Sequence, residues 1–91
     1  MIYTVYILYS HTHDAIYTGY SSNLLKRFLS HNQLGKDWTK RYRPWKVIYC
    51  EYYDNKAHAR NREKELKSGQ GRQWIRKCIN EQLPVYGYIF P

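Results

Sequence analysis

The sequence is poor in acidic residues, cysteines and long apolar runs, and each shortage excludes a class of protein. Only 7 of its 91 residues are Asp or Glu, against 15 Lys or Arg, which gives a formal charge of +8. The two cysteines, Cys50 and Cys78, lie far apart, which excludes a disulfide framework or an all-cysteine zinc site and predicts a reducing compartment. No run approaches the ~20 apolar residues of a membrane span, and the N-terminal stretch has no signal-peptide pattern. We therefore expect a cytoplasmic protein that does not enter the membrane.

The charge balance points to a polyanionic partner. A field of +8 over 91 residues attracts polyanions, and nucleic acid is the first candidate. Eleven tyrosines and three tryptophans add hydroxyls that can face phosphates and rings that can stack, although most of them should belong to the core or its rim. The alternative is a basic protein that is merely soluble, or one that associates with the ribosome.

Strand patterns occur in three places. A chain of this length makes one domain with a single modest core, and the sequence has no internal repeat or low-complexity linker. Runs of β-branched and aromatic residues are typical of strands, and a polar connection of hairpin length joins the first two. The third run is apolar almost throughout, which is typical of a well-covered strand, and we expect it beside the two strands of the hairpin. The expected strands are Tyr3–Tyr9, Ala15–Gly19 and Trp45–Tyr53.

Helical patterns follow the second and third strands. Capping residues precede each of the first two apolar stripes, and a glycine follows each. The expected helices run from a cap at residues 21–23 to Gly35, from a cap at Asp54 or Asn55 to about Lys67 before Gly69, and, after a break at Ser68–Arg72, through a short stripe of Trp74, Ile75, Cys78 and Ile79. The pattern predicts an α+β fold, a small three-stranded β-sheet flanked by helices in the order ββαβαα. Residues 1–82 would form the domain, and residues 83–91 an aromatic tail that adds an edge strand, covers the core or makes a dimer contact.

Glu63 is unusual within the second expected helix. It lies four residues after Ala59 and three before Leu66, so it falls on the apolar stripe rather than on the solvent face. A carboxylate that faces inward must be paired, protonated or bound to a metal. The helix alone favours an ion pair with an Arg or Lys, whereas an arginine and two tyrosines upstream in the chain favour a metal ligand.

Several short motifs follow one another along the chain. They are Thr4-Val5-Tyr6, Tyr17-Thr18-Gly19, the pair Arg27 and His31 on one side of a helix, and Arg62-Glu63. Together they resemble the signature of the GIY-YIG nuclease superfamily over about residues 3–80. The resemblance is closest to short stand-alone bacterial members related to the nuclease subunit of structure-specific endonucleases. Thr4 stands where the namesake motif has Gly, and Thr18 where it has Ile, but neither position would supply catalytic atoms.

The resemblance implies a metal-dependent endonuclease that hydrolyses DNA phosphodiester bonds and leaves 5′-phosphate and 3′-hydroxyl ends. Glu63 would hold a single Mg²⁺ or Mn²⁺, and Arg27 would grip a phosphate oxygen with its planar fork. Tyr6 would act as general base toward the attacking water, Tyr17 would position that water or share the role, and His31 would relay a proton or hold a tyrosine hydroxyl. So small a domain has little surface for reading a long site, which favours structure-selective or weakly sequence-specific cutting, in DNA repair or recombination.

Cations outside these motifs are expected to hold the nucleic-acid backbone, DNA before RNA. They outnumber the Asn and Gln residues suited to reading base edges, so phosphate contacts are expected to dominate. The candidate nucleic-acid contacts are Lys26, Lys36, Lys40, Arg41, Arg43, Lys67, Arg72 and Arg76. Two alternatives stay open: a module that binds DNA or RNA without cutting, for example at the ribosome, and a subunit that needs a protein partner or a second copy, joined through residues 83–91.

Overall fold

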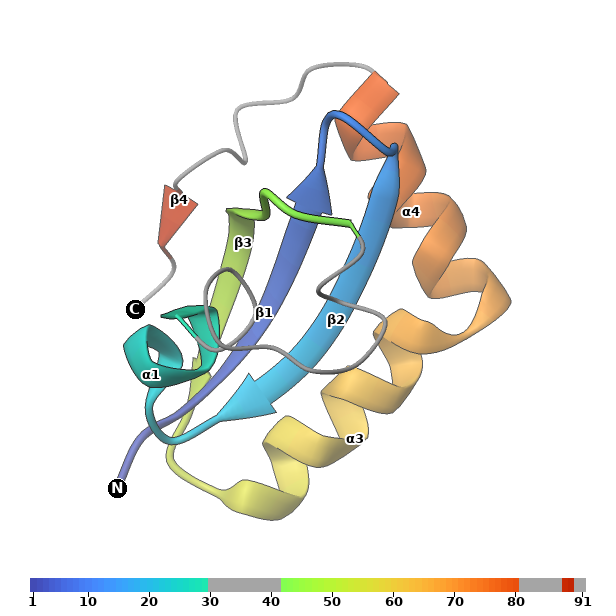
Figure 1. Ribbon diagram of the computed structural model, residues 1–91. Helices are drawn as coiled ribbons and strands as arrows, with labels where there is room; N and C mark the ends of the chain where they lie inside the picture. Colours follow the sequence, from blue (N-terminus) through green and yellow to red (C-terminus); the bar gives the residue numbers. More distant parts are fainter. Residues whose placement is uncertain (30–41, 81–87, 90–91) are drawn as a thin grey trace.

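Strands and helices follow one another in the predicted order in the computed structural model, which describes residues 1–29, 42–80 and 88–89 (Figure 1). The described elements are β1 (Tyr3–Ser10), β2 (Ala15–Ser21), α1 (Leu24–Leu29), β3 (Lys46–Tyr53), α3 (Lys56–Lys67), α4 (Gly69–Asn80) and β4 (Tyr88–Ile89). The α+β class and the order of the elements are thus confirmed, whereas the predicted end of the first helix at Gly35 lies outside the described residues. No helix in the described part of the chain is long and apolar enough to cross a bilayer.

Strand β1 is central in the sheet. The strand order is β2-β1-β3-β4, with β1 antiparallel to both of its neighbours and β4 parallel to β3. Strand β1 is buried from Thr4 to Ser10 because it has a strand on each side and packed side chains on both faces. Strand β3 does not lie beside both hairpin strands as expected: it pairs with β1 and β4, since β1 separates it from β2. Strand β4 makes the end of the aromatic tail an edge strand, one of the three roles left open.

The two faces of the sheet carry different layers. Val5 and Ile7 face α3 and α4, where they pack in one cluster with Leu66 and Ile75. Tyr6 alternates with them and faces the opposite layer, which includes Leu24 of α1. Helix α3 contacts both β1 and the edge strand β2, and Figure 1 shows α3 and α4 following one another beside β2. Tyr6 and α3 therefore lie on opposite faces of the sheet, and α3 also reaches the β2 edge.

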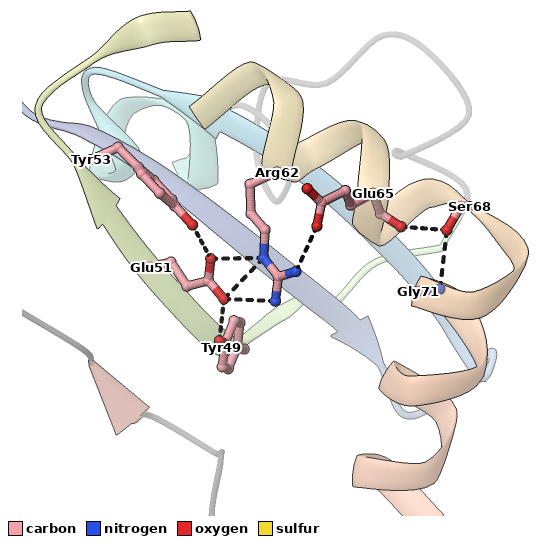
Figure 2. Close-up of polar contacts among 7 residues, drawn as sticks. All are labelled: Tyr49, Glu51, Tyr53, Arg62, Glu65, Ser68 and Gly71. Atoms are coloured by element: carbon pink, nitrogen blue, oxygen red, sulfur yellow. Dashed lines mark hydrogen bonds and ion pairs between the residues drawn. The ribbon is translucent and has the colours of Figure 1, made fainter. Parts of the chain in front are cut away.

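A single residue, Ser68, separates α3 from α4, where the sequence predicted a longer break. Its hydroxyl donates to the carbonyl of Glu65 at 2.5 Å and accepts from the backbone N–H of Gly71 at 3.2 Å, so it ends one helix and caps the next (Figure 2). A Cβ on Gly71 would lie 2.5 Å from Cα of Leu66, so glycine is required for this close approach. Gly69, which was expected to end α3, is the first residue of α4 instead.

Two further expectations about the helices have different outcomes. Of the two candidate caps, Asn55 caps α3, and its side chain accepts from the backbone N–H of His58 at 3.2 Å. The other members of the apolar stripe in α4 are buried as predicted, whereas Trp74 is 39% exposed and its ring meets that of Tyr49 edge-on. The helix therefore packs on the sheet through a narrower stripe than the sequence indicated.

Arg62 fastens α3 to β3 (Figure 2). Its guanidinium donates to the carboxylate of Glu51 from Nε at 2.9 Å and from Nη2 at 3.1 Å, and to Glu65 from Nη1 at 3.1 Å. The hydroxyls of Tyr53, at 2.5 Å, and Tyr49 donate to the same Glu51 carboxylate. Helix α3 has few buried apolar residues, so these charge-assisted hydrogen bonds contribute much of its attachment to the sheet.

Arg62→Met keeps the aliphatic stem and removes the fork, and it is expected to lower the free energy of unfolding by about 2 kcal/mol. The reason is that Glu51, whose side chain is 15% exposed, would stay largely buried without its charged partner. Urea unfolding at pH 7 measures the loss. Glu65→Gln is the matched control, because its carboxylate is exposed and its removal should cost less than about 0.5 kcal/mol. Equal losses in the two variants would contradict the attachment.

The same ion pair should make stability depend on pH. Burial on its own would raise the pKa of the Glu51 carboxyl, but hydrogen bonds from Arg62, Tyr49 and Tyr53 outweigh burial and the pKa is lowered. A carboxyl with a lowered folded-state pKa contributes stability above its unfolded pKa of about 4.3, and that stability is lost as pH falls through the folded value. The stability difference between the parent and Arg62→Met should therefore be complete near neutral pH and shrink below about pH 4.

Candidate active site

Tyr6 lies across Gly19 on the neighbouring strand. The two residues are register partners between β1 and β2, and Tyr6 is fully buried. A Cβ added to Gly19 would lie 2.7 Å from the hydroxyl oxygen of Tyr6 and 3.1 Å from Cε1 of Tyr17, so glycine is required for both rings to lie there. The two rings are stacked, with centroids 6.3 Å apart. The register of the hairpin thus brings two phenol rings together on one face of the sheet.

Gly19→Ala is expected to displace these rings and lower the free energy of unfolding by about 1–3 kcal/mol, the usual cost of overpacking. In a Tyr6→Phe background the loss should be smaller, because the atom nearest to the added methyl group is gone. Thermal unfolding of the parent, the two single variants and the double variant measures this coupling. Strictly additive losses would contradict the placement of the Tyr6 hydroxyl over Gly19.

Helix α1 brings Arg27 to the two tyrosines. Asn23 caps this helix as predicted: its side chain accepts from the N–H of Lys26 at 3.1 Å and its carbonyl from the N–H of Arg27 at 3.2 Å. The Arg27 guanidinium hydrogen-bonds to Tyr6 and Tyr17, and the Tyr6 contact raises the pKa of Arg27. Burial raises the pKa of Tyr6 to about 12, although the Arg27 hydrogen bond acts in the opposite direction. Tyr6 is therefore a neutral phenol at neutral pH in this structure.

Glu63 approaches the same cluster from α3. Its side chain is 17% exposed, which agrees with its place on the apolar stripe, and the ammonium of Lys67 lies 3.5 Å from its Oε1. Its charge raises the pKa of Tyr6, so the carboxylate is within electrostatic reach of that hydroxyl. The ion pair with a lysine, one of the two interpretations of the sequence, is thus present, and the role of metal ligand stays a prediction.

The residues around Glu63 fit a single hard cation. Among the described residues there is no cluster of three or more His, Cys, Asp or Glu that would enclose an ion in protein ligands. Mg²⁺ prefers oxygen ligands and keeps several of its waters, so one carboxylate within electrostatic reach of the Tyr6 hydroxyl can serve as its protein ligand. The ammonium already beside Glu63 shows that this largely buried carboxylate accommodates positive charge.

The predicted nucleic-acid-binding cations lie in several different parts of the fold. Lys26 is exposed on α1, and Arg43 is half-buried shortly before β3. Lys67 and Arg72 line, together with Tyr17, a hollow of about 350 Å³ beside β2, so the structure brings these two cations to the candidate site. Outside the described residues lie His31, Lys36, Lys40 and Arg41.

Arg76 has a structural partner that the sequence did not reveal. Its guanidinium donates to the side chain of Asp14 at 2.5 Å and to the carbonyl of Asp14 at 2.9 Å, which ties α4 to the β1–β2 turn. The Tyr9 hydroxyl donates to the same carboxylate at 2.6 Å. Arg76 and Asp14 are 62 residues apart, so no local signal links them. The pairing of Glu63 with Lys67 could have been found, because residues four apart face each other on a helix.

The fold is that of a small α+β domain, and it brings two tyrosines, an arginine and a glutamate into one cluster. A family model described as the GIY-YIG catalytic domain matches residues 2–77, and the chain belongs to the GIY-YIG family. It is similar to a UPF0213 protein of Staphylococcus saprophyticus, with 40% identity over 68 residues, 74% of this chain and 82% of that protein. A UPF0213 protein of Clostridium perfringens is 39% identical over 74 residues, 76% of this chain and 80% of that protein. The solution NMR structure of a UPF0213 protein from Bacillus halodurans matches with a TM-score of 0.52 at 25% identity, covering 85% of this chain and 84% of that one.

These similarities confirm the resemblance drawn from the motifs. Membership of the family implies a nuclease-type domain whose substrate is nucleic acid. Nucleases of this family generally depend on a divalent metal ion. The matched residues include all the motif positions from β1 to α3 and end before the aromatic tail.

Proposed function

We propose that the protein is a metal-dependent endonuclease that hydrolyses DNA phosphodiester bonds in the cytoplasm, with structure-selective or weakly sequence-specific cutting that serves DNA repair or recombination. One observation carries this proposal: Arg27 hydrogen-bonds to both Tyr6 and Tyr17, and Glu63 acts on Tyr6 through its charge. The four residues come from four different elements, β1, β2, α1 and α3. Residues 1–82 would carry the activity, and residues 83–91 would be an accessory segment that offers a contact to a protein partner or a second copy.

Arg27 would act on the phosphate that is cut. Its planar donor fork can hold a non-bridging oxygen of the phosphate and offset the charge that builds up as the bond to phosphorus forms. The same guanidinium lowers the pKa of Tyr6 by its hydrogen bond, so it favours the phenolate as well. One divalent ion bound at Glu63 would supply further charge neutralisation and help for the leaving oxygen.

Tyr6, first deprotonated to the phenolate, would take a proton from the attacking water at its phenolic oxygen. The water oxygen then bonds to phosphorus, the bond from phosphorus to the 3′ oxygen breaks, and that oxygen leaves as a 3′-hydroxyl once it is protonated. Because Tyr6 is fully buried and Tyr17 lines an open hollow, we place the water on the Tyr17 side, where the second hydroxyl orients it. His31 would relay the proton onward.

A second candidate function is a module that binds DNA or RNA without cutting. The observations that favour it are the pKa of about 12 for Tyr6, which keeps the phenol protonated, and the lysine that already neutralises Glu63. Both features would also be found in a nuclease that lacks its metal ion and substrate.

A cleavage assay separates the two functions. Branched, single-stranded and duplex DNA, with a matched RNA, are each incubated with the protein in Mg²⁺ or Mn²⁺ and, separately, in EDTA. Products that appear only with a divalent ion and carry 5′-phosphate ends support the nuclease. Tight binding without any metal-dependent product, on every substrate, would favour the binding module.

A further inference from the structure

We propose that Lys67 exchanges partners at the candidate site. Its ammonium neutralises Glu63 in the free protein, gives up this carboxylate to a divalent ion, and then joins Arg72 in holding a nucleic-acid phosphate in the hollow beside Tyr17. The inference rests on the proposed function, because it assumes that Glu63 is the metal ligand. It goes beyond the proposed function by naming Lys67 and Arg72 as the cations that hold the phosphodiester next to the site. It also makes Lys67 a competitor of the metal ion for Glu63.

The ion pair between Lys67 and Glu63 is long, and its lysine is exposed to solvent. The two charged atoms are 3.5 Å apart, longer than a well-formed hydrogen bond, and the Lys67 side chain is 51% exposed. Such a pair is held weakly, because water competes for the ammonium. Glu63 is much more buried, and a buried carboxylate needs a positive charge nearby. The carboxylate therefore requires a cation more than the lysine requires this carboxylate.

The hollow beside β2 offers the ammonium a second position. Lys67 and Arg72 line it together with Tyr17, so two cations and a candidate catalytic tyrosine share one space of about 350 Å³. Within the described part of the chain, Arg72 takes part in no ion pair, and Lys67 pairs only with Glu63. The two cations are thus available to a phosphate that enters the hollow.

A divalent ion at Glu63 would drive the exchange. An ammonium and a divalent ion that share one carboxylate repel each other, and this repulsion acts over a few ångströms even near the protein surface. Lysine has a flexible stem of four carbons, so its head can move from the carboxylate to the hollow while α3 stays in place. A phosphate in the hollow supplies the negative charge that Lys67 has lost.

The plain alternative is that Lys67 only stabilises α3 through its spacing of four residues from Glu63. Removing the lysine charge would then change helix stability slightly and leave ligand binding unchanged. The partner exchange predicts instead two effects of opposite sign, tighter binding of the divalent ion and weaker binding of the nucleic acid. A purely structural role of Lys67 would produce neither of these two effects.

Lys67→Met, which keeps the stem and removes the charge, tests the proposal on the full chain. Mn²⁺ is titrated without DNA by electron paramagnetic resonance, and binding of a duplex is measured by fluorescence anisotropy in saturating Ca²⁺ over a series of salt concentrations. We expect Mn²⁺ affinity to rise about twofold to fivefold, the value of an exposed ion pair that no longer competes. We expect DNA affinity to fall, and the slope of its logarithm against that of salt to drop by about one.

Three further variants make the result specific. Lys64→Met removes an exposed lysine from the same helix and should leave both affinities unchanged. Arg72→Gln should weaken DNA binding and leave Mn²⁺ affinity unchanged, because Arg72 forms no ion pair with Glu63. Lys67→Arg keeps the charge and should stay near the parent in both measurements.

The outcomes distinguish this inference from the proposed function. Unchanged Mn²⁺ affinity in Lys67→Met overturns the partner exchange even if the parent cuts DNA, and so does a parent that binds no divalent ion. Tighter Mn²⁺ binding together with weaker DNA binding supports the exchange even if no DNA is cut, in which case the proposed function alone fails. A Glu63→Gln variant that binds Mn²⁺ as the parent does would also overturn the exchange, because the ion would then sit elsewhere.

Discussion

Replacing Glu63 by Gln is expected to reduce metal-dependent cleavage by about 10²–10³-fold while nucleic acid stays bound as tightly as in the parent, or more tightly. The amide keeps the shape of the side chain but removes the charge that would hold the ion. Because the carboxylate is largely buried beside Tyr6, its negative charge also repels a phosphate that enters the site. Removing this charge should therefore lower the cleavage rate and maintain or raise the affinity for nucleic acid.

Cleavage rates at saturating DNA, together with dissociation constants in EDTA, measure both effects. Glu65→Gln is the matched control, since it makes the same substitution on the same helix at an exposed carboxylate. If Glu63 served only the ion pair with Lys67, its replacement would change the melting temperature and leave the cleavage rate of the folded protein unchanged. A folded Glu63→Gln variant that cuts at the parental rate would rule out the metal site.

The fold could be predicted from the sequence wherever one local signal dominated. The β-branched and aromatic runs predicted all three long strands to within two residues of their observed bounds, and the cap at Asn55 marked the start of α3. The junction of α3 and α4 was placed wrongly because Gly69 and Gly71 both indicate a break. Ser68 instead satisfies both helix ends by itself, and Gly71 serves the close packing of the two helices.

The sequence indicated residues of the candidate site that the structure brings together, but it did not indicate the environment that sets the pKa of Tyr6. The motifs indicated Tyr6, Tyr17 and Arg27, and the apolar stripe indicated an inward Glu63. What the sequence could not supply was the burial that raises the pKa of Tyr6, since this depends on packing between strands and helices. The same limit applies to the tie between Arg76 and the β1–β2 turn, which only the folded chain brings together.

Arg27→Lys is expected to lower the cleavage rate by about 10²-fold and to affect DNA binding much less. Lysine keeps the positive charge, which is sufficient for attraction to the DNA backbone, but it loses the fork that reaches both Tyr6 and Tyr17. The hydrogen bond from Arg27 lowers the pKa of Tyr6 against the effect of burial. Without the fork the pKa of Tyr6 should rise, so the increase of the cleavage rate with pH should move to higher pH.

Cleavage rates between pH 7 and 10 and an ultraviolet titration of the tyrosines measure the two effects independently. Arg60→Lys, at an exposed arginine on α3, is the matched control and should change neither. Tyr6→Phe removes the proposed general base. It should therefore abolish the increase of the cleavage rate with pH and most of the activity, while the folded structure persists. Because Arg27 acts in part through Tyr6, adding Arg27→Lys to Tyr6→Phe should cost less than it does in the parent. Independent losses, or stable variants that cut as well as the parent, would end the assignment of this pair.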